Sequence, residues 1–439
     1  MKIFLPILLS FTLVQATVFN LDQTIKFALS NSALILSAKE DLKISKAQTI
    51  ESRSAALPTL QFISSGTKNY SIAGTPISFP TPQGVIDTTI SFGRELQGVY
   101  GINIDQTLYD GRVISAIRAA KVFKKLTSAT YDLQLHTVLK NTKIAFYTVL
   151  LSEKLTDVVS NSLERARNHL ENTQLLFNSG NVSELDLIRA ESSVAEQETQ
   201  LATVIKNEAI SLENLKLVIG YPLTDEFIVS GSFQENFEEI LSYDELTQIL
   251  LENQPAINQA QENYNLLTEN VRSYYSEFMP SIVLSGSWQM FQMNDKEYFQ
   301  YEDFQKNQSL SLNIIFPLFN GLGSIARLNK ARANAKKAKY RAEDVQKTQR
   351  MELRKIHLTI NETIGKINAG NKNLELAERG LEIAHDLYNK GMTRQLDLLD
   401  AELNYNQAEL GLIQAIYEYH VTTALLSYIT GKPIEELYK

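Results

Sequence analysis

Cysteine is absent from this 439-residue sequence. Its absence excludes disulfide bonds, thiolate metal sites and cysteine nucleophiles. It also excludes a diacylglyceryl anchor, which requires a cysteine at the signal cleavage site, so we expect a protein that is not lipid-anchored. Long apolar runs are missing after the N-terminal segment, and this excludes helical membrane spans from the rest of the chain.

An excess of basic residues is also missing. The 42 Lys and Arg residues are outnumbered by 50 Asp and Glu residues, which gives a net charge of −8. Nucleic-acid binding requires Lys and Arg in excess where the phosphate backbone lies. We therefore expect no nucleic-acid partner, and we interpret the basic run within residues 327–355 as a solvated helix face.

The sequence shows no catalytic pattern. Its five His residues lack metal-ligand spacing, and no nucleophile or pair of acids stands out. Residues 321–326 formally match the dinucleotide fingerprint G-x-G-x-x-A, but the helix predicted there is far longer than the helix of a nucleotide-binding unit. We therefore predict that the protein is not an enzyme and binds no cofactor.

The N-terminus has the pattern of a secretory signal peptide. Lys2 precedes an apolar stretch over residues 3–14, and the segment ends on the small residue Ala16. These features predict that residues 1–16 are a signal peptide, which is removed on export.

The chain contains an internal repeat. The segment LFNSGNVSELDLIRAE, residues 176–191, aligns with LYNKGMTRQLDLLDAE, residues 387–402, and the match continues without a gap for about thirty residues. We divide the mature chain into a first repeat at 17–222, an equatorial connector at 223–242, a second repeat at 243–433 and a C-terminal tail at 434–439. The first repeat has the longer loop, between residues 58 and 110.

Each half is predicted to contain a helix, two strands, a very long helix, a turn and a final helix. The long helices, 111–178 and 321–389, would each extend about 100 Å at 1.5 Å per residue. The four shorter helices would each extend about 55 Å, so two of them end to end match one long helix, as in a closed helical wall. They are expected at residues 21–57, 183–220, 243–279 and 393–431. Three- and four-residue steps predict a coiled-coil seam at Leu396, Leu399, Leu403, Leu410, Ile413 and Tyr417.

The predicted strands have one apolar face and one polar face. Leu310, Leu312, Ile314 and Phe316 alternate with polar residues, and Trp288 belongs to another alternating segment. We expect these five residues to face lipid, although a soluble half-buried sheet would show the same alternation. Four strands cannot close a membrane sheet, so copies of the chain must combine. Two copies would supply 8 strands and three would supply 12, and the pattern leaves both open.

The repeated motif L-(F/Y)-x-x-G-x-x-x-x-L-D-L resembles the helical hairpin tip of TolC-type outer membrane efflux proteins. Leu57-Pro58 and the (D/N)-G pairs at residues 110–111 and 320–321 extend the resemblance over nearly the whole mature chain. The resemblance implies a mixed α and β membrane protein in the bacterial outer membrane. Its fold would be a homotrimeric 12-stranded β-barrel, four strands per chain, continuous with a periplasmic 12-helix α-barrel.

The two hairpin tips are expected to dock a periplasmic adaptor, which would connect them to an inner-membrane pump or transporter. Glycine suits the left-handed residue that ends a long helix, and Ser or Thr can cap the next helix. An alternative is that the tips are only helical turns. The residues assigned to docking are Gly180, Ser183, Leu185, Gly391, Thr393, Arg394 and Leu396.

The same resemblance assigns Asp397 and Asp400 to acidic rings that narrow the periplasmic entrance, with Tyr388 in the closing network. Three copies would bring six carboxylates around one axis, where repulsion raises some pKa values. In the first half Asp186 is retained and Arg189 replaces the second Asp, which would allow a latch across neighbouring hairpins. The alternative for Asp397 and Asp400 is a solvated pair that complements the helix dipole.

These features predict a passive gated exit duct of a tripartite efflux or type I secretion system, embedded in outer membrane lipid. The main alternative is a periplasmic coiled-coil adaptor or scaffold without a membrane barrel.

Overall fold

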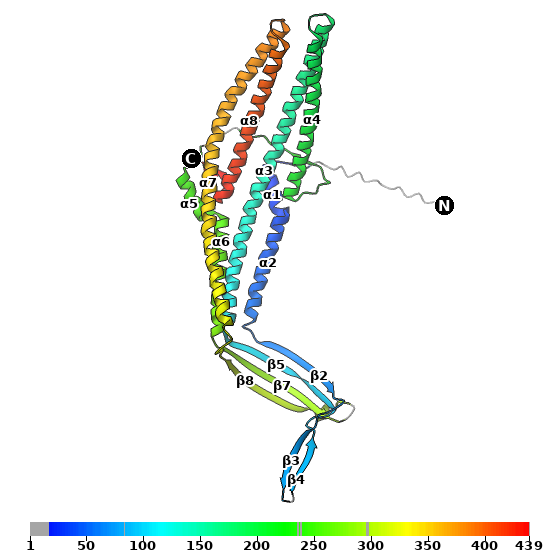
Figure 1. Cartoon of the computed structure of the whole chain (residues 1–439), viewed down its shortest axis with the longest axis vertical. Helices are drawn as coiled ribbons and strands as arrows, with labels where there is room; N and C mark the ends of the chain where they lie inside the picture. Colours follow the sequence, from blue (N-terminus) through cyan, green and yellow to red (C-terminus); the bar gives the residue numbers. More distant parts are fainter. Residues whose placement is uncertain (1–16, 83, 235–236, 238, 296–297, 439) are drawn as a thin grey trace, which may run out of the picture. The chain divides into compact units, whose positions relative to one another are not determined.

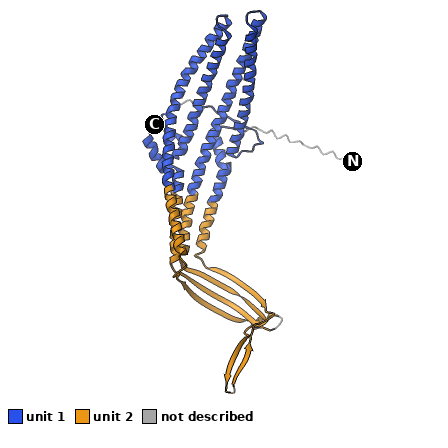
Figure 2. Ribbon diagram, viewed as in Figure 1, with its two compact units in different colours: residues 1–41, 128–260, 341–439 blue, residues 42–127, 261–340 orange. Residues whose placement is uncertain are grey.

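The computed structural model describes residues 17–82, 84–234, 237, 239–295 and 298–438 (Figure 1). The predicted signal peptide lies outside the described residues. The chain divides into two compact units, each built from segments of both halves of the sequence (Figure 2). Unit 2 consists of residues 42–127 and 261–340, and unit 1 contains the remaining residues.

Unit 2 is built around a four-stranded antiparallel sheet in the order β2-β5-β7-β8. The strands are β2 (Thr59–Lys68), β5 (Leu96–Asp110), β7 (Ser281–Asn294) and β8 (Gln305–Ile315). Both outer strands, β2 and β8, pair on one side only within this sheet, and every residue of β8 is exposed. The sheet is therefore open at two edges.

The two faces of this sheet differ in chemistry, as the alternation predicts. The cross-strand row Leu60–Ile104–Gly286–Leu310 lies on one face, and Leu284–Leu312 and Ile282–Ile314 continue it. On the other face, Ser285 donates a hydrogen bond to Asp105 (2.6 Å) and Ser287 donates one to Asn103 (3.0 Å). Period-2 patterning thus produces one apolar face and one polar, hydrogen-bonded face.

Trp288, Leu310, Leu312 and Ile314 all lie on the apolar face. The inclusion of Phe316 among the strand residues is wrong, because β8 ends at Ile315. Pro317 follows Phe316, and proline has no N–H to donate to a strand ladder. Phe316 is exposed just beyond the strand end.

The long loop of the first half contains a hairpin that the sequence analysis missed. Strands β3 (Thr75–Thr81) and β4 (Gly84–Ile90) pair with each other in antiparallel register. Thr and Pro interrupt the apolar alternation in this segment, so its pattern is weak.

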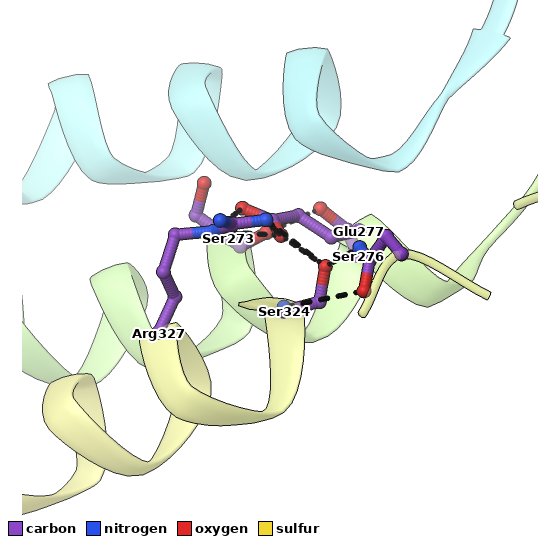
Figure 3. A network of polar contacts seen from close by, with 6 residues as sticks. Ser273, Ser276, Glu277, Ser324 and Arg327 are labelled. Atoms are coloured by element: carbon purple, nitrogen blue, oxygen red, sulfur yellow. Dashed lines mark hydrogen bonds and ion pairs between the residues drawn. The ribbon is translucent and has the colours of Figure 1, made fainter. Parts of the chain in front are cut away.

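The long helices are α3 (Gly111–Asn178) and α7 (Gly323–Asn389). The prediction that the second long helix begins at residue 321 is wrong by two residues, because Gly321 and Leu322 have left-handed φ values of 67° and 68°. A network of hydrogen bonds and ion pairs stabilises the first turn of α7, as Figure 3 shows. Ser324 donates to the Glu277 carboxylate (2.7 Å), and Arg327 donates to the same group (2.7 Å). The G-x-G-x-x-A stretch therefore begins a helix.

Two of the shorter helices are broken, whereas continuous helices were predicted over 21–57 and 243–279. The first forms α1 (Leu21–Asn31) and α2 (Ala33–Ser54), and the second forms α5 (Tyr243–Asn253) and α6 (Pro255–Tyr275), followed by η1 (Ser276–Phe278). Pro255 accounts for the second break, since the residue before proline disfavours helical backbone.

The end of another helix lies against each of these breaks, which are at Ser32 and Gln254 in unit 1. The final helices of the two halves, α4 (Glu184–Ile219) and α8 (Gln395–Thr430), end at Gly220 and Gly431, which have φ values of 77° and 69°. A Cβ atom at Gly220 would lie 2.5 Å from the Asn31 carbonyl oxygen, and one at Gly431 would lie 2.5 Å from that of Asn253. Only glycine fits these two positions.

Among the described residues, unit 1 has two hydrophobic clusters. One contains Leu246, Leu353 and Leu426, together with Leu437 from the segment after η3 (Ile434–Glu436). The other contains Phe146, Leu215 and Phe227, the last from the parallel pair β1 (Thr17–Phe19) and β6 (Phe227–Val229). These strands have three residues each, too few for a periodic signal, and the sequence analysis missed them.

The predicted seam of α8 is only partly correct. Leu396 and Leu403 are exposed, whereas the buried residues of this helix include Leu398, Leu412 and Tyr419. Apolar residues occur all around α8, so its sequence pattern does not identify one buried face. Across the described residues, no helix combines the length and hydropathy needed to cross a membrane.

Leu215 provides a test of the second cluster. Leu215→Ala should lower the free energy of unfolding by about 2–5 kcal/mol, because Leu215 is 0% exposed and the smaller side chain leaves a cavity. The matched control is Leu217→Ala on the same helix, since Leu217 is 70% exposed. Urea unfolding followed by circular dichroism measures both, and equal losses would contradict the assigned core.

Candidate functional site

The candidate site is formed by the tips of two helical hairpins in unit 1, α3/α4 and α7/α8. At the first tip the backbone N–H groups of Gly180 and Asn181 donate to the carbonyls of Phe177 and Leu176, each at 2.9 Å. Gly391 and Met392 make the corresponding two bonds at the second tip. The φ values of Gly180 and Gly391 are 75° and 70°, so their predicted left-handed conformation is confirmed.

Ser183 caps α4 as predicted. Its hydroxyl oxygen accepts a hydrogen bond from the backbone N–H of Asp186 (3.3 Å), and the Asp186 carboxylate accepts one from the backbone N–H of Ser183 (3.1 Å). The Ser183 hydroxyl also donates to that carboxylate (2.7 Å), and this bond lowers the pKa of Asp186. Asp186 therefore stabilises a helix start.

The second tip is capped differently from the prediction. The N-cap of α8 is Arg394, one residue after Thr393. The Thr393 hydroxyl does not accept a bond from the helix; it donates to the Asp397 carboxylate (2.8 Å). That carboxylate also accepts from the backbone N–H of Arg394 (3.2 Å). A carboxylate thus replaces the hydroxyl as the capping acceptor.

Asp397 and Asp400 have different environments. The Arg394 guanidinium lies 3.0 Å from the Asp397 carboxylate, and hydrogen bonds from Arg394 and Thr393 lower the pKa of Asp397 to about 2. Within one chain, therefore, the nearest charge to Asp397 is positive. The expected repulsion between carboxylates of three copies stays a prediction. Asp400 is exposed to solvent.

Arg189 does not connect the two hairpins of the chain. Its guanidinium lies 3.6 Å from the Asp186 carboxylate, one turn earlier on α4. A pair at this spacing is a local contact on one helix. The expected latch between neighbouring hairpins of different copies stays a prediction.

Gln395 connects the hairpins instead. Its side-chain nitrogen Nε2 lies 3.0 Å from the backbone oxygen of Asp186 on α4 and 3.0 Å from Nε2 of His169 on α3. We call this pair of contacts the Gln395 bridge. Gln395 is 5% exposed and His169 is 7% exposed, so the bridge lies away from solvent.

Tyr388 packs beside the bridge. Its ring centroid lies 5.3 Å from that of His169, and the buried hydroxyl has no hydrogen-bond partner within the described part of the chain. Both residues line an open cavity of about 560 Å³ between α3, α7 and α8. The cavity contains several acids but, among the described residues, no group of three or more His, Asp or Glu side chains suited to a metal ion.

The remaining tip residues are accessible. Leu185 and Leu396 are exposed, and the Arg394 side chain is 79% exposed. A second groove of about 550 Å³ runs between α3, α4 and α8, and Arg189 and Leu396 line it. The tips therefore combine a stiff backbone with exposed apolar and charged side chains.

Sequence reasoning missed Gln395 and His169. The five His residues lack metal-ligand spacing and so were assigned no site, and a glutamine at the first position of a helix has no special pattern. The two residues are 226 positions apart, and no local period reports a contact over that distance.

Comparison with known proteins identifies the family. Residues 24–221 and 246–432 match the family described as outer membrane efflux protein. The chain belongs to the outer membrane efflux protein family. The predicted outer membrane location is thereby confirmed, and the adaptor alternative is not favoured.

Individual family members resemble this chain in sequence. Outer membrane protein TolC of Salmonella enteritidis is 25% identical over 345 residues, covering 75% of this chain and 68% of TolC. Alkaline protease secretion protein AprF of Pseudomonas aeruginosa is 20% identical over 332 residues, covering 75% of this chain and 69% of AprF.

Solved structures of outer membrane proteins share the fold. The CmeC outer membrane channel of Campylobacter jejuni has a TM-score of 0.79 at 18% identity, covering 94% of this chain and 85% of CmeC. VceC of Vibrio cholerae has a TM-score of 0.76 at 16% identity, covering 94% of this chain and 96% of VceC.

The pairing of Arg394 with Asp397 can be tested by titration. Arg394→Ala should raise the pKa of Asp397 from about 2 toward the ordinary value of 3.8, because it removes the largest cause of the lowering. Since the pKa is depressed, the stabilisation from this pair is present above pH 3.8 and is lost as the pH falls through about 2. Carboxyl-carbon NMR of Asp-labelled protein measures the pKa.

The control for this titration is Lys390→Ala, which removes an exposed cation paired with Asp386. It should leave the titration of Asp397 unchanged. An unaltered Asp397 pKa in Arg394→Ala would contradict the assigned cause.

Proposed function

We propose that this protein is a passive, gated exit duct in the outer membrane. Three copies would form it, and substrate would arrive from an inner-membrane transporter through a periplasmic adaptor. The observation that carries the proposal is the open four-stranded sheet, apolar on one face and polar on the other, in a member of the outer membrane efflux protein family.

The open edges support assembly from several copies. Unpaired backbone N–H and C=O groups are too costly in hydrocarbon, so a membrane sheet must close on itself. Joining β8 of one copy to β2 of the next would pair both edges and continue the apolar face around a barrel. Three copies give 12 strands, the number implied by the resemblance to TolC-type proteins.

The helices also present surface suited to a second copy. The exposed large apolar residues of α7 include Met351, Leu358, Leu376 and Ile383. Their spacings of about 7, 18 and 7 residues are close to whole numbers of turns, so they share one face. An apolar stripe of this kind typically marks a surface that another helix covers.

The hairpin tips are proposed as the docking surface for the adaptor and as the gate. AprF is named as a secretion protein and CmeC as an outer membrane channel, and either transport class is consistent with a duct. Outward movement of the tips would separate the acidic rings and widen the entrance. In this scheme energy comes from the partner transporter.

Within the proposed gate, Asp400 should influence ion passage more than Asp397. Arg394 already balances the charge of Asp397, whereas the Asp400 carboxylate is exposed. In planar bilayers we expect Asp400→Ala to bring the K⁺ over Cl⁻ permeability ratio toward unity and to reduce block by multivalent cations. Asp397→Ala should have a smaller effect.

The matched control is Asp157→Ala, an exposed acid on α3 paired with Lys154 and distant in sequence from the tip. It should conduct like the unaltered protein. Unchanged selectivity in Asp400→Ala would refute the gate assignment, and absence of any conductance in the unaltered protein would refute the duct itself.

Assembly is tested by introducing a charge on the α7 stripe. Leu376→Glu should convert the trimer to smaller species, because burying a carboxylate in a helix contact is unfavourable. Light scattering of detergent-solubilised protein measures the mass. Asn371→Glu, which places the same charge at another exposed position of α7, should leave the trimer intact. A mass of two copies in the unaltered protein would support an eight-stranded alternative.

A further inference from the structure

We propose that the Gln395 bridge is a pH-sensitive contact between the two hairpins, which holds while His169 is neutral and breaks when His169 binds a proton. The bridge lies within one chain, so this inference does not depend on transport. Its consequence for a duct rests on the proposed function: loss of three such contacts would loosen the entrance.

The orientation of the Gln395 amide follows from its partners. One atom, Nε2, contacts both the Asp186 carbonyl oxygen and His169 Nε2, each at 3.0 Å. A backbone carbonyl only accepts hydrogen bonds, so the amide must present its NH₂ group there. The second amide hydrogen then points to His169 Nε2, which must accept it. His169 is therefore neutral in this arrangement, with its proton on Nδ1.

Protonation removes at least one of these two bonds. An imidazolium ring donates from both nitrogens, so Nε2–H of His169 would face the NH₂ group of Gln395. Rotating the amide by half a turn would place its oxygen against the ring, which is favourable. The same oxygen would then face the Asp186 carbonyl oxygen, which is unfavourable. Because a single amide atom makes both contacts, no orientation satisfies both once His169 is charged.

Burial makes this loss consequential. Gln395 and His169 are both more than nine-tenths buried, so solvent does not replace a lost hydrogen bond. The Oε1 atom of Gln395 already has no partner within the described residues, so the amide has no competing bond holding it in place. The bridge therefore responds directly to the charge of the ring.

Each helix beside His169 carries charged or titratable groups. On α3, Arg165 donates to Ser162 (2.9 Å) and Asn406 (2.6 Å) and does not bond the ring. On α4, Asp186 offers its backbone oxygen, while its carboxylate is bonded to Ser183. The others that line the same cavity are Glu378, Glu382, His385, Asp386 and Tyr388 from α7 and Glu402 and Tyr405 from α8.

The balance of these groups keeps His169 neutral near pH 7. Burial is the main cause that lowers the pKa of His169 below 6.5, and the nearby His385 lowers it further. Burial also raises the pKa of Glu402, which weakens its attraction for a charged ring. Separation of the hairpins exposes the ring and removes the burial that lowers its pKa, so acid favours the separated hairpins below pH 6.5. This range lies above the titration of Asp397, whose pKa is about 2.

The absence of cysteine makes the test direct, because two labels can be attached without removing native thiols. Asn181→Cys and Met392→Cys place one spin label on each exposed tip turn. Pulsed electron paramagnetic resonance of the full chain, diluted with unlabelled protein, measures the tip-to-tip distance at about pH 7.5 and about pH 5, either side of the ordinary His pKa. We expect a longer and broader distribution at the lower pH, reversible on neutralisation.

Two variants identify the groups responsible. Gln395→Leu cannot form the bridge, so its distribution should be broad and the same at both pH values. Gln395→Glu should invert the response, since a carboxylate accepts from the protonated ring and repels the Asp186 carbonyl oxygen. His136→Gln is the matched control, because His136 is another partly buried histidine of α3 whose pKa burial lowers. It should respond like the unaltered protein.

The proposal is overturned if the unaltered protein gives the same distances at both pH values, or if Gln395→Leu retains the response. If Gln395→Glu does not fold, Gln395→Leu decides alone. If the protein conducts ions in bilayers but the tip-to-tip distance does not change with pH, the proposed duct is supported and the pH-sensitive bridge is refuted. If the distance changes with pH but the protein does not conduct, the proposed duct is refuted and the pH-sensitive bridge is supported.

Discussion

Unpaired backbone groups along β2 and β8 are the constraint on which the rest of this structure depends. A four-stranded sheet with two open edges cannot be stable in hydrocarbon by itself. The chain therefore has the properties of a segment of a larger assembly. Its β8 strand is exposed throughout, and large apolar residues lie uncovered on both the sheet and α7. Such exposure would be a liability in a soluble monomer, but it is consistent with a wall that neighbouring copies and lipid cover.

The same carboxylates that could line a gate have structural roles at the hairpin tips. Asp186 and Asp397 each accept hydrogen bonds at a helix start, which keeps the tip turns rigid and keeps both groups ionised. Asp397 is further balanced by Arg394. In the proposed gate, Asp400 would therefore be more available to passing ions than Asp397. A gate built in this way could change shape by moving whole hairpins, since the backbone hydrogen bonds of each turn lie within that turn.

Much of the fold was predictable because its signals are local. Period-2 alternation located Trp288, Leu310, Leu312 and Ile314 on one sheet face, and the repeated motif located both left-handed glycines. The predictions were wrong where the local sequence pattern was absent or ambiguous. Nothing in the segment around Ser32 marks a helix break. Apolar residues occur on all sides of α8, so its sequence pattern does not show which of them are buried. Thr393 was expected to cap the next helix as Ser183 does, but the cap lies one residue later, at Arg394.

The sequence by itself determined the long helices, the left-handed glycines of the tip turns, the two-faced strands and the family, because each depends on neighbouring residues or on a repeated motif. Tertiary structure alone decided which hairpin residues meet. Gln395, His169 and Asp186 come from three helices, and 226 positions separate the first two. Their contact depends on how helices pack side by side, and side-chain hydrogen bonds across a packed interface have no period in the sequence. For that reason a glutamine without any motif forms one of the links between the hairpins, in addition to the Arg165–Asn406 bond.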